Sequence, residues 1–320
     1  MSTHSCSRKT IALITVMALI TACSPSDEQP GDVAGAEPAM ESLVSAAWLN
    51  QHIDEPDLVV LDCTVIVEFD ENGSFRSVNG RDNYERGHIP GAGFADLMGD
   101  LSDSEAPFEF TAPSPEAFAA AMAALGVGDD TRVVVYDTYN SAWAARVWWM
   151  LRWIGFDRAA ILDGGLKAWT TEGLSLSSEA ASRPARSLSV SLRPELMADQ
   201  DEVRASINND AISVIDALPA ESYLGDWTMY GRPGHIAGAT NVPGVLFHDE
   251  EGLFRSHDEL DMLFDGDRNG RAITYCGGGI AAAQNAFVMT RLGFKDVAVY
   301  DNSLQEWAAD PANPMETGTE

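Results

Sequence analysis

The residues of this chain that are best suited to chemistry surround Cys276, in the segment Thr-Tyr-Cys-Gly-Gly-Gly-Ile-Ala-Ala at 274–282. An apolar, β-rich run at 272–275 leads to the cysteine, and an alanine-rich helical pattern follows the three glycines. Glycines let consecutive backbone amides turn toward one point, and a helix start adds the positive end of its dipole. Amides that converge on sulfur stabilise a thiolate or a persulfide. We therefore predict that Cys276 is a nucleophile, against the common alternative of a small buried hydrophobic cysteine.

Acidic residues strongly outnumber basic ones in the whole chain. The sequence has 49 Asp and Glu against 20 Lys and Arg, which gives a net charge of −29. Such a chain is repelled by nucleic acids and by anionic lipid surfaces, so we expect no nucleic-acid partner. An anionic substrate would need a local basic group or backbone amides to overcome this field. The length of 320 residues leaves room for about two domains.

The first 22 residues have the pattern of a targeting segment. Arg8 and Lys9 precede an apolar run at 11–20 that is too short to span a bilayer comfortably. The following Ile-Thr-Ala-Cys at 20–23 resembles a bacterial lipobox, which implies cleavage before Cys23 and lipidation of that cysteine. An ordinary cleaved signal peptide is the alternative. We expect the mature protein on the periplasmic side of the bacterial cell envelope, held to a membrane only through this lipid.

Cysteine usage separates a structural thiol from a functional one. Cys6 is lost with the signal segment and Cys23 carries the lipid, so Cys63 and Cys276 are left in the mature fold. Two thiols in an oxidising compartment could form a disulfide. Because these two follow strands in different halves of the chain, we expect them to be unpaired, with a structural Cys63 and a functional Cys276.

The body of the chain consists of two copies of one pattern. A Gly-Phe pair recurs at 155–156 and 293–294, 138 positions apart, and Trp169 recurs at the same spacing as Trp307. Short β-branched runs alternate with helical patterns at 114–125, 143–154, 199–208 and 281–292. This alternation predicts an α/β fold with two tandem domains, each a mainly parallel sheet flanked by helices. The predicted organisation is a signal peptide at 1–22, a disordered tether at 23–41, a first domain at 42–174, a linker at 175–195 and a second domain at 196–320.

Polar residues that recur in both copies are predicted to be structural. His88 and His235 occupy the same motif position, and Asp62 and Asp216 both end predicted strands. Because both copies keep these residues, we expect hydrogen bonds that support the loops rather than proton transfer.

Five motifs, in order, resemble the tandem-domain rhodanese family, the thiosulfate and 3-mercaptopyruvate sulfurtransferases. The motifs are His-Ile-Pro-Gly-Ala at 88–92, Arg-Val-Trp-Trp-Met at 146–150, Leu-Asp-Gly-Gly-Leu at 162–166, the loop at 276–281 and the tail at 310–318. The resemblance implies two rhodanese-like domains, of which the first is catalytically silent and carries Asp137 where the second carries Cys276. It also implies chemistry without a metal or an organic cofactor, and we expect a monomer.

The reaction implied by the resemblance is sulfur transfer through a persulfide. The Cys276 thiolate would take the outer sulfur of a small anionic donor, 3-mercaptopyruvate or thiosulfate, and pass it to a thiol or cyanide acceptor. Backbone amides of the loop would stabilise the terminal sulfur as an oxyanion hole stabilises oxygen. The loop residues assigned to this role are Gly277, Gly278, Gly279, Ile280, Ala281 and Ala282.

Three departures from the family pattern concern donor binding. Gly277 and Gly278 stand where thiosulfate enzymes carry basic residues, and Gly278 also replaces a serine of mercaptopyruvate enzymes. Ser222 occupies the place of a substrate-binding arginine. Arg232 is the nearest candidate substrate-binding residue, with a solvated loop charge as the alternative. The aromatic stretch at 227–230 either lines the mouth of the pocket or packs against the other domain.

Two rival functions follow from the same residues. A related Cys-loop phosphatase would need an arginine six positions after the cysteine to grip phosphate, and Ala282 stands there, which disfavours it. A surface lipoprotein that carries or senses sulfur without turnover is the stronger alternative, because the family's serine and arginine are missing.

Overall fold

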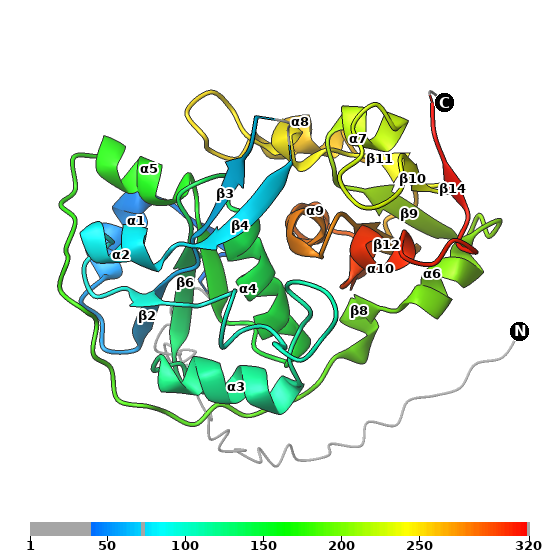
Figure 1. Cartoon of the computed structure of the whole chain (residues 1–320). Helices are drawn as coiled ribbons and strands as arrows, with labels where there is room; N and C mark the ends of the chain where they lie inside the picture. The colour runs from blue at the N-terminus through cyan, green and yellow to red at the C-terminus, as the bar shows by residue number, and fades with distance from the viewer. Residues whose placement is uncertain (1–39, 72–73, 319–320) are drawn as a thin grey trace, which may run out of the picture. The chain divides into compact units, whose positions relative to one another are not determined.

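We describe residues 40–71 and 74–318 in a computed structural model of the chain. The expectations for the signal peptide at 1–22, for Cys23 and for most of the tether lie outside these residues. A five-stranded parallel sheet forms the centre of the first half, in the order β1-β7-β6-β2-β5 (Figure 1). Its strands are β1 (Leu43–Val44), β2 (Leu58–Asp62), β5 (Gly93–Phe94), β6 (Arg132–Tyr136) and β7 (Ala159–Leu162).

Helices and one hairpin surround this first sheet. The helices are α1 (Ala46–His52), α2 (Arg81–Arg86), α3 (Pro115–Ala124), α4 (Ala142–Trp153) and α5 (Gly165–Thr171). The antiparallel hairpin consists of β3 (Val65–Phe69) and β4 (Phe75–Asn79). Residues 178–193 of the predicted linker contain no helix or strand and lead to a short 3₁₀ turn, η1 (Pro194–Leu196).

The second half repeats the first around another five-stranded parallel sheet, in the order β11-β9-β12-β13-β8. Its strands are β8 (Met197–Ala198), β9 (Ile212–Asp216), β11 (Thr240–Asn241), β12 (Arg271–Tyr275) and β13 (Asp296–Tyr300). Its helices are α6 (Gln200–Ser206), α7 (Ala220–Leu224), α8 (His257–Asp261), α9 (Ile280–Arg291) and α10 (Ser303–Trp307), with a 3₁₀ turn η2 (Gly244–Phe247). The short strands β10 (His235–Ile236) and β14 (Met315–Glu316) pair antiparallel at its edge.

The two sheets have the same strand order, with each strand of one corresponding to a strand of the other. The four helices predicted from the sequence lie where expected, and each begins and ends within two residues of the predicted bounds. The predicted fold class is therefore confirmed: two tandem domains, each a mainly parallel sheet flanked by helices.

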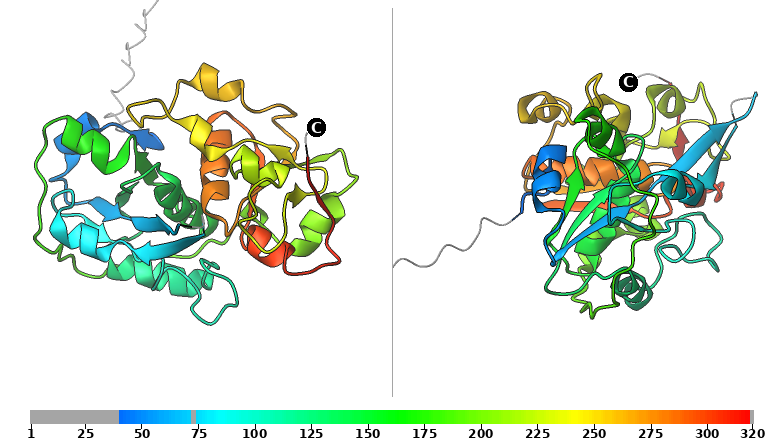
Figure 2. Two further views of the ribbon diagram at one scale, coloured as in Figure 1. Left: turned by 45° about the horizontal axis from the view of Figure 1, so that its top comes forward. Right: turned by 90° about the vertical axis from the view of Figure 1, so that its left-hand side faces the viewer.

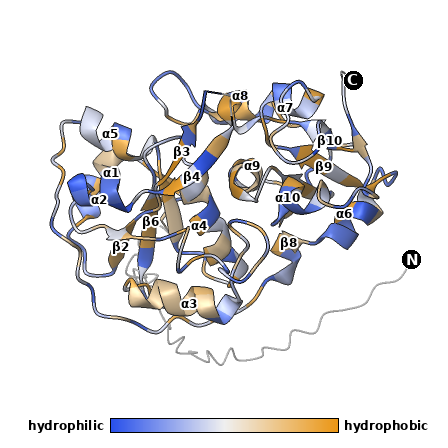
Figure 3. Ribbon diagram, viewed as in Figure 1, coloured by the Kyte–Doolittle hydropathy of each residue, from blue (hydrophilic) through white to orange (hydrophobic). Residues whose placement is uncertain are grey.

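The core runs through both halves because α4 and α9 pack against each other (Figure 2). Trp148 of α4 meets Phe287 of α9 edge to face, with ring centroids 4.8 Å apart. The central strands are apolar on both faces, whereas the exposed helices α2 and α6 are mainly hydrophilic (Figure 3). Because both faces of these strands are buried, their sequences are continuous apolar runs rather than alternating ones. Within residues 40–71 and 74–318, every helix is too short or too polar to cross a bilayer.

Candidate active site

Cys276 lies directly after β12, at the carboxyl edge of the second sheet, where open α/β sheets bind ligands. Its side chain is buried, with 3% of the residue exposed. The loop then enters α9 through Gly279, which has φ 75°. Side chains rarely adopt this left-handed conformation, and a Cβ at 279 would also lie 2.6 Å from the carbonyl oxygen of Asp301. The strand–loop–helix geometry predicted from the glycines is therefore present.

The loop of the first copy shows what this kind of loop binds. Asp137 follows β6 as Cys276 follows β12, and four backbone amides donate hydrogen bonds to its carboxylate at 2.9–3.1 Å. Burial raises the pKa of Asp137, whereas these four amides act in the opposite direction. The first loop is thus an amide cradle with a built-in anion. The donors are the N–H groups of Tyr139, Ser141, Trp143 and Ala144.

The Cys276 loop keeps most of its amides free of protein partners. The N–H groups of Cys276 and Gly279 donate to the hydroxyl of Ser303, at 3.0 and 3.2 Å. Ser303 is fully buried and has φ 51°, a conformation rare for a residue other than glycine. Within the described part of the chain, no hydrogen-bond partner is present for the other loop amides, those of Gly277, Gly278, Ile280, Ala281 and Ala282.

Sequence reasoning missed Ser303, although the repeat contained a signal for it. The corresponding residue of the first copy is Gly165, which also has a positive φ of 53°. Serine is strained at this positive φ, whereas glycine is not, but its hydroxyl binds two amides of the loop. Strained residues of this kind are common at functional sites.

Each glycine of the loop has a different neighbour where a side chain would stand. A Cβ at Gly277 would overlap the ring of Tyr230, so Gly277 is needed for close approach rather than for its φ. A Cβ at Gly278 would lie 2.5 Å from Nε2 of Gln305, and one at Gly279 would lie 2.8 Å from Nη1 of Arg146.

The aromatic stretch at 227–230 packs against the other domain, which is one of the two readings that the sequence left open, and it also touches the Cys276 loop. Tyr230 lies against the Cys276 loop, and it also meets Phe75 of the β3–β4 hairpin at a centroid distance of 5.8 Å. Trp227 meets Phe69 of the same hairpin at 6.2 Å. Burial raises the pKa of Tyr230, with a further contribution from the neighbouring Cys276, so its hydroxyl stays protonated.

Arg146, which the sequence marked only as part of a family motif, reaches the second loop from α4 of the first domain. It is fully buried, forms an ion pair with Asp301 and donates to the carbonyl of Phe110 at 2.8 Å. Its Nε and Nη1 atoms have no hydrogen-bond partner among the described residues. The counterpart of Arg146 on α9 is Gln284, which donates to the carbonyl of Asn140 in the loop after β6. The Cys276 loop thus receives a cation from the other domain, whereas the Asp137 loop receives a neutral amide.

The recurring polar residues make the structural contacts expected of them. The ring of His88 stacks on Tyr84, and that of His235 stacks on Tyr223, with centroids 3.9 and 3.7 Å apart. In each pair, Nδ1 of the histidine is 2.7 Å from the tyrosine carbonyl oxygen. The same geometry occurs in a copy with a cysteine and in a copy with an aspartate after the central strand, which indicates a role in the fold.

Asp216 ends β9 beside Tyr275, next to the strand that carries Cys276. One carboxylate oxygen accepts the N–H of Leu218 at 2.8 Å, while the other has no partner among the described residues. Burial raises the pKa of Asp216 to about 6. The contact with Leu218 agrees with the predicted support of the loop after β9.

The side chain of Arg232 contacts the C-terminal segment of the chain rather than the Cys276 loop. Its two terminal nitrogens donate to the carbonyls of Asp310 and Asn313, at 2.9 and 2.8 Å. These contacts hold the C-terminal segment against the second domain. A direct role of Arg232 in binding the donor stays a prediction.

The two cysteines of the described fold are unpaired, as expected. Cys63 is completely buried in the first domain, and burial raises its pKa well above the ordinary value. A protonated thiol without access to solvent is a poor nucleophile, which suits the predicted structural role. Within residues 40–71 and 74–318, no group of three or more His, Cys, Asp or Glu side chains could hold a metal ion.

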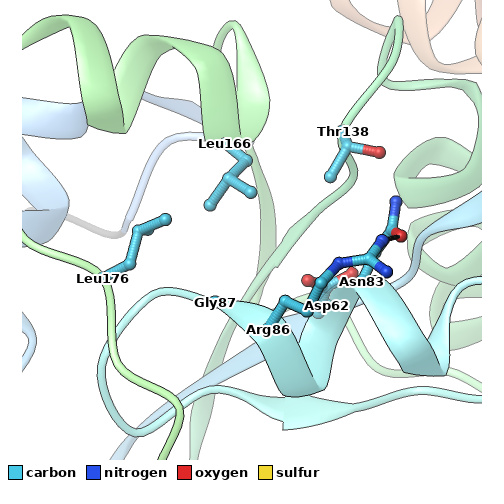
Figure 4. Close-up of a pocket in the computed structure, with 7 residues that line it drawn as sticks. All are labelled: Asp62, Asn83, Arg86, Gly87, Thr138, Leu166 and Leu176. Atoms are coloured by element: carbon cyan, nitrogen blue, oxygen red, sulfur yellow. Dashed lines mark hydrogen bonds between the residues drawn. The ribbon is translucent and has the colours of Figure 1, made fainter.

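The first domain has a small cavity at its own strand ends, with a volume of about 280 Å³ (Figure 4). Thr138, the residue after Asp137, contributes to it, but Asp137 itself does not. None of the residues that line this cavity is a cysteine. It is lined by Asp62, Asn83, Arg86, Gly87, Thr138, Leu166 and Leu176.

Comparison with known proteins agrees with this geometry. The Rhodanese-like domain family matches residues 45–172 and 199–310. The 3-mercaptopyruvate sulfurtransferase of Escherichia coli (strain K12) is 35% identical over 284 residues, which cover 86% of this chain and 97% of that protein. The thiosulfate sulfurtransferase of Cricetulus griseus is 33% identical over 279 residues, with coverages of 83% and 91%.

A solved structure extends the comparison to three dimensions. The crystal structure of SseA from Escherichia coli, described as a 3-mercaptopyruvate sulfotransferase, superimposes with a TM-score of 0.73 at 34% identity. The match covers 82% of this chain and 99% of that one. The chain belongs to the rhodanese family, with two tandem rhodanese-like domains. Its enzyme class is that of a sulfurtransferase, as the sequence predicts.

Proposed function

We propose that this sulfurtransferase moves a sulfane sulfur from a small anionic donor to a thiol or cyanide through a persulfide on Cys276. The Cys276 thiolate attacks the outer sulfur of the donor, a new S–S bond forms, and the bond from that sulfur to the donor breaks. The electron pair leaves with the donor as pyruvate enolate or sulfite. An acceptor thiolate or cyanide then removes the outer sulfur and returns Cys276 to the thiolate.

The observation that carries this proposal is the amide cradle around Asp137. In the silent copy, four backbone N–H groups bind a carboxylate at the residue that corresponds to Cys276. In the second copy the residue is a thiol, and five loop amides are left without a protein partner within the described residues. An anionic persulfide sulfur would accept hydrogen bonds from such amides, and this stabilises charge without any cation in the loop.

Of the two donor types, we propose that 3-mercaptopyruvate is preferred over thiosulfate. Thiosulfate is a dianion, and the loop at 277–282 contributes no Lys or Arg to bind it in a chain of net charge −29. A donor with a single negative charge meets less repulsion and depends more on neutral hydrogen-bond donors.

A donor panel scored by intact mass tests the proposed function. The purified full chain, treated with 3-mercaptopyruvate or thiosulfate, is expected to gain about 32 Da, one sulfur atom as a persulfide. Cyanide or a thiol should then remove the added mass. Pyruvate and sulfite, which lack a transferable sulfur, serve as matched controls and should add nothing. If neither donor adds sulfur to the protein, the proposed function is contradicted, whereas sulfur that is taken up but not released to cyanide or a thiol would favour a protein that carries or senses sulfur without turnover.

We also propose that Cys23 carries a lipid that holds the protein on the periplasmic side of the cell envelope. The support is the sequence Ile-Thr-Ala-Cys at 20–23 after a short apolar run. In a bacterial host, Cys23→Ser is expected to move the protein from the membrane fraction to the soluble fraction and to abolish labelling with a fatty acid. Cys6→Ser, a matched change within the same leader, should leave both unaltered. A Cys23→Ser protein that stays labelled and membrane-bound would contradict the anchor.

A further inference from the structure

Gln305 fills the space beside Gly278, the second glycine after Cys276. Gly278 presents no side chain, and a Cβ there would lie 2.5 Å from Nε2 of Gln305. Gln305 is in α10, whose first turn runs along the loop. The N–H groups of Leu304 and Gln305 donate to the carbonyls of Cys276 and Gly277, both at 3.0 Å. These two backbone hydrogen bonds hold α10, and with it the side chain of Gln305, against the Cys276 loop.

The orientation of this amide follows from a contact with the silent domain. The backbone N–H of Glu109 donates to Oε1 of Gln305 at 2.9 Å. Because an N–H can only donate, the oxygen must face Glu109, and the NH₂ group must face Gly278. No group within residues 40–71 and 74–318 accepts a hydrogen bond from Nε2. Gln305 is half-buried, so these two N–H donors are held in place and can still be reached from solvent.

We propose that Gln305 is a catalytic residue for sulfur transfer, in which its Nε2 donates a hydrogen bond to an anionic oxygen of the sulfur donor. This inference rests on the proposed persulfide function of Cys276. As the bond between the outer sulfur and the donor breaks, the electron pair moves onto the leaving group, and negative charge grows on its oxygen. The N–H of Gln305 stabilises that oxygen as an oxyanion-hole donor does.

The amide differs from a hydroxyl in one respect that sets the chemistry. It donates a hydrogen bond but transfers no proton, so the pyruvate enolate leaves as an anion and is protonated by water. Sulfite needs no such proton. The loop backbone and Gln305 therefore add neutral N–H donors to the cation that Arg146 places beside Gly279, in a chain whose net charge is −29.

Gln305→Glu is the sharpest test, because it keeps an acceptor for the N–H of Glu109 while it removes the donor. We expect kcat/KM for 3-mercaptopyruvate to fall about 10- to 100-fold in Gln305→Ala and at least as far in Gln305→Glu. Ala309→Glu places the same charge on an exposed residue after α10 and should retain the activity of the unmodified chain. Alkylation of Cys276 gives a second measurement that needs no turnover. In Gln305→Glu, the rate of alkylation by the anion iodoacetate should fall relative to the rate with neutral iodoacetamide, and the iodoacetamide rate itself should change little.

A second variant restores the donor at the neighbouring position. In Gln305→Ala the space beside residue 278 is vacated, so adding Gly278→Ser should supply a hydroxyl and recover about 10-fold in kcat/KM. In the presence of Gln305 the Gly278→Ser side chain meets Nε2, so the single change should lower activity.

The outcomes separate the two proposals. If Gln305→Glu keeps full kcat/KM while Gln305→Ala loses it, Gln305 only accepts from Glu109, and the inference is overturned. Equal loss of reactivity toward iodoacetate and iodoacetamide would also overturn it, since that pattern means a displaced loop. If the unmodified chain forms no persulfide with either donor, the proposed function fails. The alkylation ratio then still reports whether Gln305 directs anions to Cys276.

Discussion

Replacement of Cys276 by serine is expected to abolish sulfur uptake while leaving the fold intact. The hydroxyl nearly fills the volume of the thiol, but its pKa is far above that of a thiol, so it stays protonated at neutral pH and is a weak nucleophile. We expect the rate of donor cleavage to fall by about 10⁴-fold or more. Intact mass after incubation with 3-mercaptopyruvate, together with pyruvate release, measures the effect.

Cys63→Ala is the matched control for this experiment. Cys63 is completely buried and its thiol has a raised pKa, so it should contribute nothing to turnover. Loss of its sulfur from the core should lower the free energy of unfolding by about 1–2 kcal/mol. Sulfur uptake should continue at the rate of the unmodified chain. A Cys276→Ser protein that still gains one sulfur would contradict the assignment of Cys276.

The second large effect is expected at the buried ion pair between Arg146 and Asp301. The side chain of Arg146 is 1% exposed, whereas that of Asp301 is 17% exposed. Asp301→Ala would leave the guanidinium buried with only the carbonyl of Phe110 as an acceptor. We therefore expect a loss of about 3–5 kcal/mol in the free energy of unfolding, measured by chemical denaturation.

Because Arg146 is more deeply buried than Asp301, a double-mutant cycle on the two residues can test this prediction. Arg146→Met leaves a partly exposed Asp301, which still accepts the N–H of Ala112 at 2.8 Å, so it should cost less than Asp301→Ala. The double variant should be more stable than the sum of both losses implies, by at least about 1 kcal/mol. Equal, additive losses would show that the pair has no mutual stabilisation.

An exposed pair supplies the control for the cycle. Arg76 and Glu68 form an ion pair on the β3–β4 hairpin with 75% and 47% of their side chains exposed. Glu68→Ala should change the free energy of unfolding by only about 0–1 kcal/mol, because solvent screens such pairs. Sulfur uptake should fall in Asp301→Ala but not in Glu68→Ala, since only Asp301 borders Gly279 of the loop.

Much of the fold could be predicted because its signals are local and repeated. The run Arg-Val-Val-Val-Tyr at 132–136 indicates a strand buried on both faces, and the sheet contains β6 there. The Gly-Gly-Gly run after β12 predicts a tight entry into α9, and Gly279 has the positive φ that this entry needs. The spacing of 138 residues between equivalent positions predicted a second domain of the same kind, and the structure adds that the two sheets share one strand order.

The supports of the candidate site were not predictable in the same way. Ser303 appeared in the sequence only as part of the repeat, yet its hydroxyl accepts the N–H groups of Cys276 and Gly279. Gln305 stood unremarked in a short helix. Arg232, which the sequence offered as a donor-binding residue, has its terminal nitrogens on the carbonyls of Asp310 and Asn313. Nothing in the local sequence says which of these side chains faces the thiol.

By itself, the sequence determined the family, the two sheets and the identity of the candidate nucleophile, because periodicity, glycine conformation and motif spacing act over a few residues. Only the tertiary structure decided what surrounds Cys276. Glu109 meets Gln305 across 196 positions, and Arg146 meets Asp301 across 155. Both contacts join the first domain to the second, and a hydrogen bond between such distant residues leaves no periodic trace in either segment. The first domain thus completes the surroundings of the Cys276 loop.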